Sequence, residues 1–286
     1  MIFKGSGVAL ITPFNEDLSV NYKKLGELID FHIENKTDAI IILGTTGESA
    51  TLSDEEKEKI MKCAIDYANK RIKIIVGTGS NDTKHAIKLS KKAEELGADG
   101  LLIVTPYYNK CSQDGLYLHY KTIAKSVKLP IILYNVPSRT GVDISVDTVK
   151  RLASIKNIVG IKEANPSLTK VADIINLNLE NFALYSGNDD LTLPILSLGG
   201  SGVISVLANI KPKVTHEICE LYFNNEIKEA RKLFFENYEL AKDLFLDVNP
   251  IMIKYAMNYL DMKVGSCRLP LCDTSNINKE KIKKLL

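Results

Sequence analysis

The stretch Leu101-Leu102-Ile103-Val104, followed by Thr105-Pro106-Tyr107-Tyr108, sets the pattern on which the fold of this chain is built. It is a short, continuous apolar run with polar residues directly behind it. An amphipathic segment that starts at Asp82 and ends at Gly97 precedes it. A continuous apolar run is typical of a strand buried on both faces of a parallel sheet. We therefore expect a helix followed by a buried parallel strand.

The same unit recurs along the chain. The apolar runs cover residues 8–11, 40–43, 74–76, 101–104, 131–133, 158–161, 182–184 and 203–206. Between the second and third runs, Ser53 and Glu56 have the spacing of a capping box at the start of a helix. This alternation predicts an α/β fold, a (β/α)8 TIM barrel. A doubly wound open sheet is the alternative, but no GxGxxG follows the first run.

The pattern changes after the eighth run. From Asn225 the apolar spacing predicts one long helix, and Asn249-Pro250 predicts a second that begins with an Asn cap and a Pro at the first helical position. We expect a catalytic barrel over residues 1–224 and a C-terminal helical extension over 225–286. The basic residues from Lys279 to Lys284 fit the solvated face of a last helix.

Composition narrows the classes of function. The 37 basic and 35 acidic residues are interleaved and give a net charge of +2, which argues against a nucleic-acid binder. No apolar run approaches the roughly 18 residues of a membrane span, and no leader segment is visible. The five cysteines contain no CxxC, which favours a reduced, cytoplasmic protein. The four histidines are scattered without ligand spacing, so we expect no metal.

The residues behind each run are informative, because barrel enzymes carry their catalytic groups at the carboxyl ends of the strands. Lys162 directly continues an apolar run. A lysine in a dry pocket loses proton affinity and can attack a ketone to form an imine. A structural lysine paired with a rim carboxylate is the alternative.

Other rim residues suit imine chemistry. Tyr134 or Tyr108 could carry protons beside the lysine, with Thr45 linking the two phenols. The turn from Gly44 to Gly47 could offer backbone N–H groups to an anion, or it could be only a tight strand-to-helix turn.

Three motifs in order at strand ends carry a resemblance. They are Gly44-Thr45-Thr46-Gly47-Glu48, Tyr134-Asn135-Val136-Pro137-Ser138-Arg139-Thr140-Gly141 and Gly160-Ile161-Lys162-Glu163. Together they closely resemble the dihydrodipicolinate synthase family, within the pyruvate-dependent class I aldolases that include N-acetylneuraminate lyase. The resemblance covers essentially the whole chain, including Asn249-Pro250-Ile251 and Leu269-Pro270-Leu271.

The resemblance implies a reaction and its participants. Lys162 would form a Schiff base with pyruvate, and the resulting enamine would condense with L-aspartate-4-semialdehyde to give 4-hydroxy-tetrahydrodipicolinate, on the diaminopimelate route to lysine. No metal or organic cofactor would be required. The family implies a homo-oligomer, with a tetramer favoured and a dimer as the alternative.

The resemblance also implies residue roles. Tyr134 would shuttle protons with Thr45 and with Tyr108, which in this family reaches into the neighbouring subunit's site. The implied substrate-binding residues are the amides of Thr45 and Thr46 for the pyruvate carboxylate, Arg139 for the semialdehyde carboxylate, and Gly187 and Ile204 for the shape of the pocket.

A second site departs from the family pattern. Ser49, Ala50, Asn81 and Tyr107 match the pocket in which inhibited members bind lysine. Sensitive bacterial members commonly carry two histidines and an acid where this chain has Asp54, Lys57 and His85. Because a histidine replaces the acid and Lys57 adds positive charge, we expect weak or absent inhibition by lysine.

Rival functions remain at this point. N-acetylneuraminate lyase or a keto-deoxy-sugar aldolase would share the lysine and tyrosine but generally lack Arg139. A sugar-phosphate isomerase would need a phosphate site after strands seven and eight, and the glycine turn at 199–202 precedes strand eight instead. A non-catalytic binding barrel gives no reason for Lys162, Tyr134 and Thr45 to occur together.

Overall fold

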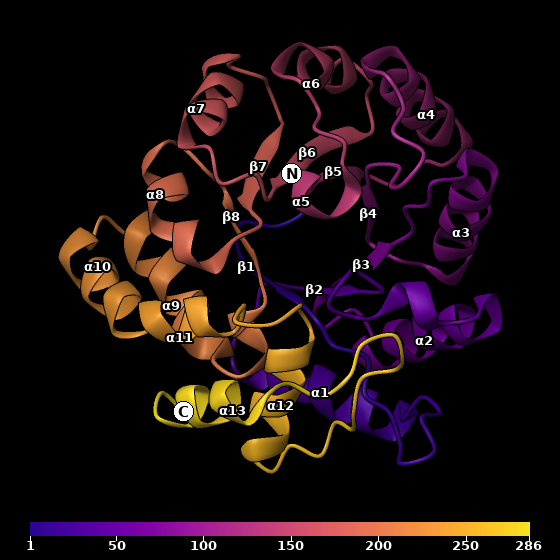
Figure 1. The fold of residues 1–286 in the computed structure, drawn as a ribbon. Helices are drawn as coiled ribbons and strands as arrows, with labels where there is room; N and C mark the ends of the chain where they lie inside the picture. Colours follow the sequence, from indigo (N-terminus) through magenta and orange to yellow (C-terminus); the bar gives the residue numbers. More distant parts are fainter.

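The computed structural model describes residues 1–286 and contains a closed barrel of parallel strands (Figure 1). All eight apolar runs form strands, so the predicted (β/α)8 barrel is confirmed and the open sheet is excluded. The strands are β1 Gly5–Ala9, β2 Ala39–Ile42, β3 Lys73–Gly77, β4 Gly100–Val104, β5 Ile131–Asn135, β6 Ile158–Glu163, β7 Ala183–Ser186 and β8 Gly202–Ser205. The barrel closes where β1 pairs with β8.

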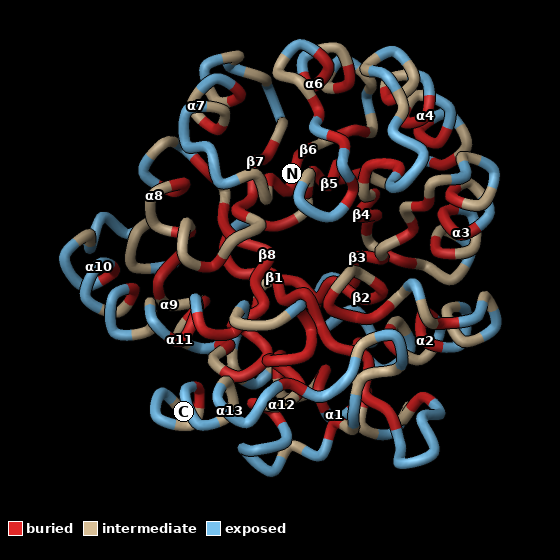
Figure 2. The backbone as a smooth tube through the Cα atoms, in the orientation of Figure 1, coloured by how far each residue is buried: buried red, intermediate tan, exposed pale blue.

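The strands separate two apolar cores, because side chains alternate between the two faces of a strand. Twelve buried residues, among them Ile41, Ile132 and Ile204, fill the inside of the barrel. A cluster of 55 buried residues lies mainly between the strands and the surrounding helices. Figure 2 shows this buried backbone at the centre of the molecule. Continuous apolar runs are therefore required, since both faces of each strand are covered.

Helices surround the barrel in chain order (Figure 1). They are α1 Tyr22–Glu34, α2 Asp54–Ala68, α3 Thr83–Leu96, α4 Gln113–Ser126, α6 Val146–Ala153, α7 Leu168–Asn176, α8 Thr192–Ser197 and α9 Pro212–Phe223. Ser53 and Glu56 form the predicted capping box at the start of α2. Asp82 caps α3, and Gly97 ends it in a left-handed conformation, as its position predicts.

The C-terminal part contains α10 Ile227–Glu236, α11 Tyr238–Asp243, α12 Ile251–Tyr259 and α13 Asn276–Lys283. The prediction of one long helix from Asn225 is wrong, because the helix is interrupted at Asn237. The Asn237 side chain donates to the Leu233 carbonyl. Its backbone N–H donates to the carbonyls of Phe234 and Phe235, at the end of α10. These local bonds compete with the helical ladder and start a new helix. Residues of α11, α12 and α13 share the large core with the barrel helices.

Asn249 does not cap α12 as predicted. The helix starts at Ile251, and Pro250 occupies the cap position without a side-chain bond. The Asn249 amide instead donates to Thr46 Oγ1 across the barrel rim (3.0 Å). The Asn249 side chain therefore forms a tertiary contact instead of the helix cap that the local sequence predicts.

No helix is both long enough and apolar enough to cross a membrane.

The amino-terminal end of the barrel is closed by Phe3, whose ring stacks on Tyr185 at 4.4 Å between centroids. The Tyr185 hydroxyl donates to the Phe3 carbonyl (2.5 Å). This closure leaves the opposite end, where the strands finish, as the accessible end of the barrel.

Candidate active site

Lys162 lies on β6 and is only 5% exposed. It pairs in register with Tyr134 of β5, so the two side chains lie on the same face of adjacent strands. Lys162 Nζ is 4.5 Å from the centre of the Tyr134 ring. No carboxylate lies within 4.0 Å of this ammonium, so the ion pair expected for a structural lysine does not form. The structure thus brings together a phenol and a buried lysine that has no carboxylate partner.

The turn from Gly44 to Glu48 follows β2 and is tightly wound. The Gly47 N–H donates to the Gly44 carbonyl (3.1 Å) and the Glu48 N–H to the Thr45 carbonyl (3.0 Å). The Thr12 hydroxyl donates to the Gly47 carbonyl (2.6 Å) and ties the turn to the end of β1. The N–H groups of Thr45 and Thr46 donate to no protein acceptor. The turn therefore presents two free backbone donors suited to an anion.

Thr45 and Tyr134 line one small cavity at the carboxyl end of the barrel. Its other lining residues are Leu43, Gly44, Ser49, Gly77, Gly79, Leu102 and Val104. A side chain at Gly77 would clash with the backbone of Leu43, and one at Gly79 with the backbone of Val104. These glycines let the segment after β2 and the end of β4 approach the end of β3 closely.

Tyr108 does not join this cavity within one chain. It is 89% exposed, in a loop after β4, and has a positive φ of 74°. The neighbouring Tyr107 is 38% exposed. Two adjacent aromatic side chains thus lie at the surface of this loop.

Arg139 lies on the short helix α5 Pro137–Thr140, and its side chain is exposed at the barrel rim. Its guanidinium donates to the Asn249 carbonyl (3.1 Å), which leaves its other N–H groups free. Asn249 therefore contacts both Arg139 and Thr46, although sequence analysis placed it only at a helix start. The Asn-Pro dipeptide was visible in the sequence, but no local signal pointed to these partners.

Gly187 directly follows β7, the strand that pairs with β6, and Ile204 lies on β8. The Gly187 N–H donates to the Glu163 carbonyl (2.8 Å). A Cβ added at Gly187 would lie 2.6 Å from the Ala164 Cβ and 3.0 Å from the Glu163 carbonyl, so glycine is needed for this close approach. Ile204 is fully buried inside the barrel, in the same cluster as Tyr134.

Sequence analysis assigned no role to Asp189, a buried carboxyl group behind the ends of β7 and β8. Its Oδ2 accepts the backbone N–H groups of Val206 (2.9 Å) and Leu207 (3.0 Å). Burial raises the pKa of Asp189, while its hydrogen bonds and the charge of Lys162 oppose that rise. Asp189 thus fixes the backbone just beyond Ile204.

The residues matching the lysine pocket lie beside the same rim. Ser49 and Ala50 form the short turn after Glu48, and the Asn81 carbonyl accepts from the Asn109 side chain (2.9 Å). The three residues that depart from the family pattern also lie close together; they are Asp54, Lys57 and His85. Asp54 contacts His85 (3.0 Å), Lys88 (2.7 Å) and Lys57 (3.9 Å). Its bonds with Lys88 and His85 lower the pKa of Asp54 to about 2.

No group of three or more His, Cys, Asp or Glu side chains is placed to hold a metal ion. The chemical groups gathered at the rim are an amine, a phenol, a hydroxyl, two backbone donors and a guanidinium. Such a set can bind a keto acid, form an imine and move protons.

Comparison with known proteins agrees with this chemistry. The model of the dihydrodipicolinate synthetase family matches residues 2–286. A 4-hydroxy-tetrahydrodipicolinate synthase from Acetivibrio thermocellus is 54% identical over 285 residues, covering 100% of this chain and 97% of the relative. The crystal structure of dihydrodipicolinate synthase from Aquifex aeolicus superposes with a TM-score of 0.97 at 48% identity, covering 99% of this chain and 97% of that one.

A more distant solved relative carries a ligand. The structure of the Cyanidioschyzon merolae synthase with lysine bound superposes with a TM-score of 0.97 at 39% identity, covering 99% of this chain and 97% of that chain. The relatives described here carry the synthase name, so the comparisons do not favour N-acetylneuraminate lyase or a sugar-acid aldolase.

Proposed function

The chain belongs to the dihydrodipicolinate synthetase family, and from that premise we propose that it condenses pyruvate with L-aspartate-4-semialdehyde through an imine on Lys162. It is an enzyme, a Schiff-base-forming lyase of the diaminopimelate route to lysine. The single observation that carries the assignment of the nucleophile is the buried Lys162 side chain, whose Nζ has no carboxylate partner and lies 4.5 Å from the Tyr134 ring centre.

Pyruvate would bind with its carboxylate at the Gly44–Glu48 turn. The unused N–H groups of Thr45 and Thr46 support this placement, because oriented backbone donors stabilise an anion. Asn249 holds the Thr46 hydroxyl and thereby steadies the turn. The neutral amine of Lys162 would then attack the keto carbon, and loss of one water would give the imine.

Proton transfer accompanies each step of imine chemistry. Tyr134 is the proposed proton carrier, because its phenol shares a cavity with Thr45 and its ring lies beside Lys162. It would protonate the departing hydroxyl group of the carbinolamine. Removal of a methyl proton then converts the imine to an enamine.

The second substrate would be held by Arg139. Its guanidinium makes one hydrogen bond, to the Asn249 carbonyl, so it can bind a carboxylate in a bidentate manner. The enamine carbon would attack the aldehyde, and the new alkoxide would take up a proton. The amine of the semialdehyde would then attack the imine carbon and displace Lys162, which closes the ring and frees the enzyme.

Assembly belongs to the same proposal. The exposed ring of Tyr108 supports a homo-oligomer, a tetramer or a dimer, in which Tyr108 of one subunit completes the proton relay of its neighbour. The five free cysteines support a reducing, cytoplasmic location.

The test is turnover of pyruvate and L-aspartate-4-semialdehyde, coupled to a reductase and oxidation of NADPH. Wild-type protein should turn over, and Lys162→Ala should not, because the nucleophile is lost. Lys62→Ala removes an exposed lysine from a surface ion pair and is the matched control. Borohydride treatment with pyruvate should trap an adduct on Lys162; absence of both turnover and adduct would refute the proposed function.

A further inference from the structure

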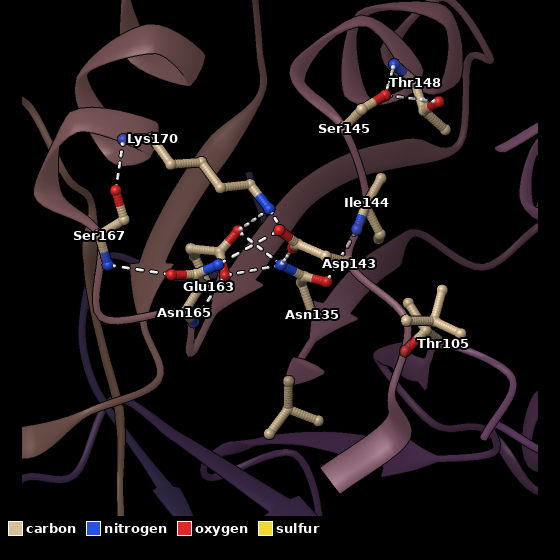
Figure 3. A network of polar contacts seen from close by, with 12 residues as sticks. Thr105, Asn135, Asp143, Ile144, Ser145, Thr148, Glu163, Asn165, Ser167 and Lys170 are labelled. Carbon is tan, nitrogen blue, oxygen red and sulfur yellow. Dashed lines mark hydrogen bonds and ion pairs between the residues drawn. The ribbon is translucent and has the colours of Figure 1, made fainter. Parts of the chain in front are cut away.

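Figure 3 shows a polar network around Asn135 and Glu163. These two residues directly follow Tyr134 and Lys162 on the same two strands, so the network lies on the outer face of the barrel strands. We propose that Asn135 and Glu163 are positioning residues: they hold the Arg139 loop at a set distance from Lys162. This proposal rests on the proposed function, because Arg139 is taken there as the anchor of the second substrate.

The register of β5 and β6 places the central residues of the network side by side. Tyr134 pairs with Lys162, and the next pair along the same strands is Asn135 with Glu163. Because successive side chains point to opposite faces, the first pair enters the barrel and the second points outward. Asn135 and Glu163 are both 0% exposed. The Asn135 amide donates to both carboxylate oxygens of Glu163, at 2.8 Å and 3.0 Å.

Asn135 also ties together the two ends of the Arg139 loop, which spans residues 136–143. The loop leaves β5 at Asn135 itself. At its far end the Asn135 amide donates to Asp143 Oδ1 (2.6 Å), and its Oδ1 accepts the Ile144 N–H (3.1 Å). The loop that carries Arg139 is therefore closed on one side chain, which in turn is held by Glu163.

The Glu163 carboxylate accepts hydrogen bonds from Asn135 and is contacted by two further donors. Besides Asn135, these donors are the Asn165 N–H (2.7 Å) and the Lys170 ammonium (3.5 Å). Lys170 also pairs with Asp143, so α7 is joined to the same loop. Burial raises the pKa of Glu163, and the charge of Lys170 opposes that rise. An acceptor-only carboxylate thus holds the network together.

The consequence for the reaction is geometric. The enamine forms on Lys162, whereas the aldehyde is held through Arg139, so their separation decides whether the two carbons meet. A misplacement of about 1 Å can reduce a rate about 100-fold. The pyruvate-binding turn after β2 makes no direct hydrogen bond with Asn135 or Glu163, and it reaches the Arg139 loop only through Asn249. Pyruvate binding should therefore depend on this network less than binding of the semialdehyde does.

The experiment measures steady-state kinetics of Glu163→Gln with each substrate varied in turn. The Gln amide would place a donor against the donors from Asn135 and Lys170. We expect the KM for L-aspartate-4-semialdehyde to rise about fivefold or more and kcat to fall about tenfold, with the KM for pyruvate changed less than about twofold.

Asp38→Asn is the matched control. Asp38 lies at the opposite end of the barrel, where it accepts from the Ser6 N–H (2.7 Å) and from His216 (3.0 Å). The Asp38→Asn variant should have a lower Tm, with unchanged KM values for pyruvate and for the semialdehyde. If Glu163→Gln behaves in the same way, with a lower Tm and unchanged KM values, the network is only structural and the proposal is wrong.

Asp143→Asn is a second variant in case Glu163→Gln does not fold. The Asp143 side chain is 45% exposed, so the change should be tolerated, and it weakens the contact with Lys170. The KM for the semialdehyde should rise selectively; equal changes in both KM values would overturn the proposal. Wild-type turnover and borohydride trapping in the same series test the proposed function separately.

Discussion

Glu48 and Lys254 form an ion pair of 2.6 Å inside the protein, with side chains only 1% and 2% exposed. Glu48 ends the turn that carries Thr45 and Thr46, whereas Lys254 lies on α12. The Lys254 ammonium also donates to the Ser266 carbonyl (3.0 Å) and lies 4.0 Å from the centre of the Phe14 ring. Burial lowers the pKa of Lys254, and the charge of Glu48 opposes this. The C-terminal helices are thus joined electrostatically to the candidate pyruvate site.

Replacing Lys254 by Met should destabilise the protein strongly. Removing one partner leaves Glu48 as an uncompensated buried charge, which costs about 3–5 kcal/mol. Urea unfolding measures the change. The double variant Lys254→Met with Glu48→Gln should recover part of the loss, and Lys62→Met in the exposed pair with Asp66 should cost less than about 1 kcal/mol. A loss no larger than that of the surface pair would contradict the assigned burial.

Gly187→Ala should cost stability and activity together. The added Cβ would meet the Ala164 Cβ at 2.6 Å and force the ends of β6 and β7 apart. Overpacking of this kind costs about 1–3 kcal/mol. Thermal unfolding and turnover measure the two effects. Adding Ala164→Gly removes the methyl contact and should restore part of both; no recovery in the double variant would mean that another contact dominates.

His216 should make stability depend on pH. Its ring bonds Asp38 (3.0 Å), which raises the pKa of His216, and Glu220 at 3.7 Å acts in the same direction. Because the folded-state pKa is above the unfolded value near 6.5, this contribution is fully present below pH 6.5. It is lost as the pH rises through the folded-state pKa.

The difference in unfolding free energy between wild type and His216→Asn should therefore be larger at about pH 5.5 than at about pH 9. Urea titrations at the two values measure it. A difference that does not change with pH would show that the pair with Asp38 is not charged in the folded protein.

L-Lysine should inhibit the enzyme weakly or not at all. The carboxylate of Asp54 already bonds His85 and Lys88, and Lys57 is 3.9 Å away, so Asp54 offers no free carboxylate to a ligand ammonium. Calorimetry and turnover with added lysine test this, with the Cyanidioschyzon merolae synthase as the positive control for binding. Full inhibition at sub-millimolar lysine would refute the prediction.

Two inactive variants should recover activity when they are mixed, if Tyr108 acts in a neighbouring site. Lys162→Ala lacks the nucleophile but offers an intact Tyr108, whereas Tyr108→Phe keeps its nucleophile. A mixed oligomer would contain sites with both groups. Dissociating and reassembling the mixture, then measuring turnover, tests this; mixtures no more active than the separate variants would place Tyr108 in its own subunit's site or outside the relay.

Much of the barrel could be predicted because parallel strands buried on both faces need continuous apolar runs, and eight such runs stand in the sequence. Lys162 could be found because it directly continues one of them. The C-terminal helices were less predictable. The apolar spacing continues past Asn237, but the side chain of that residue bonds the Leu233 carbonyl and interrupts the helix.

The sequence by itself determined the strands, their order and the residues at their ends, since these follow from apolar runs and two-residue alternation along a single segment. Only the tertiary structure decided that Asn249 holds Thr46 and Arg139, that Lys254 neutralises Glu48, and that Asn135 closes the Arg139 loop on Glu163. Those contacts join segments far apart in the chain. Their geometry arises when the barrel closes and the C-terminal helices pack on it, and no local pattern contains that information.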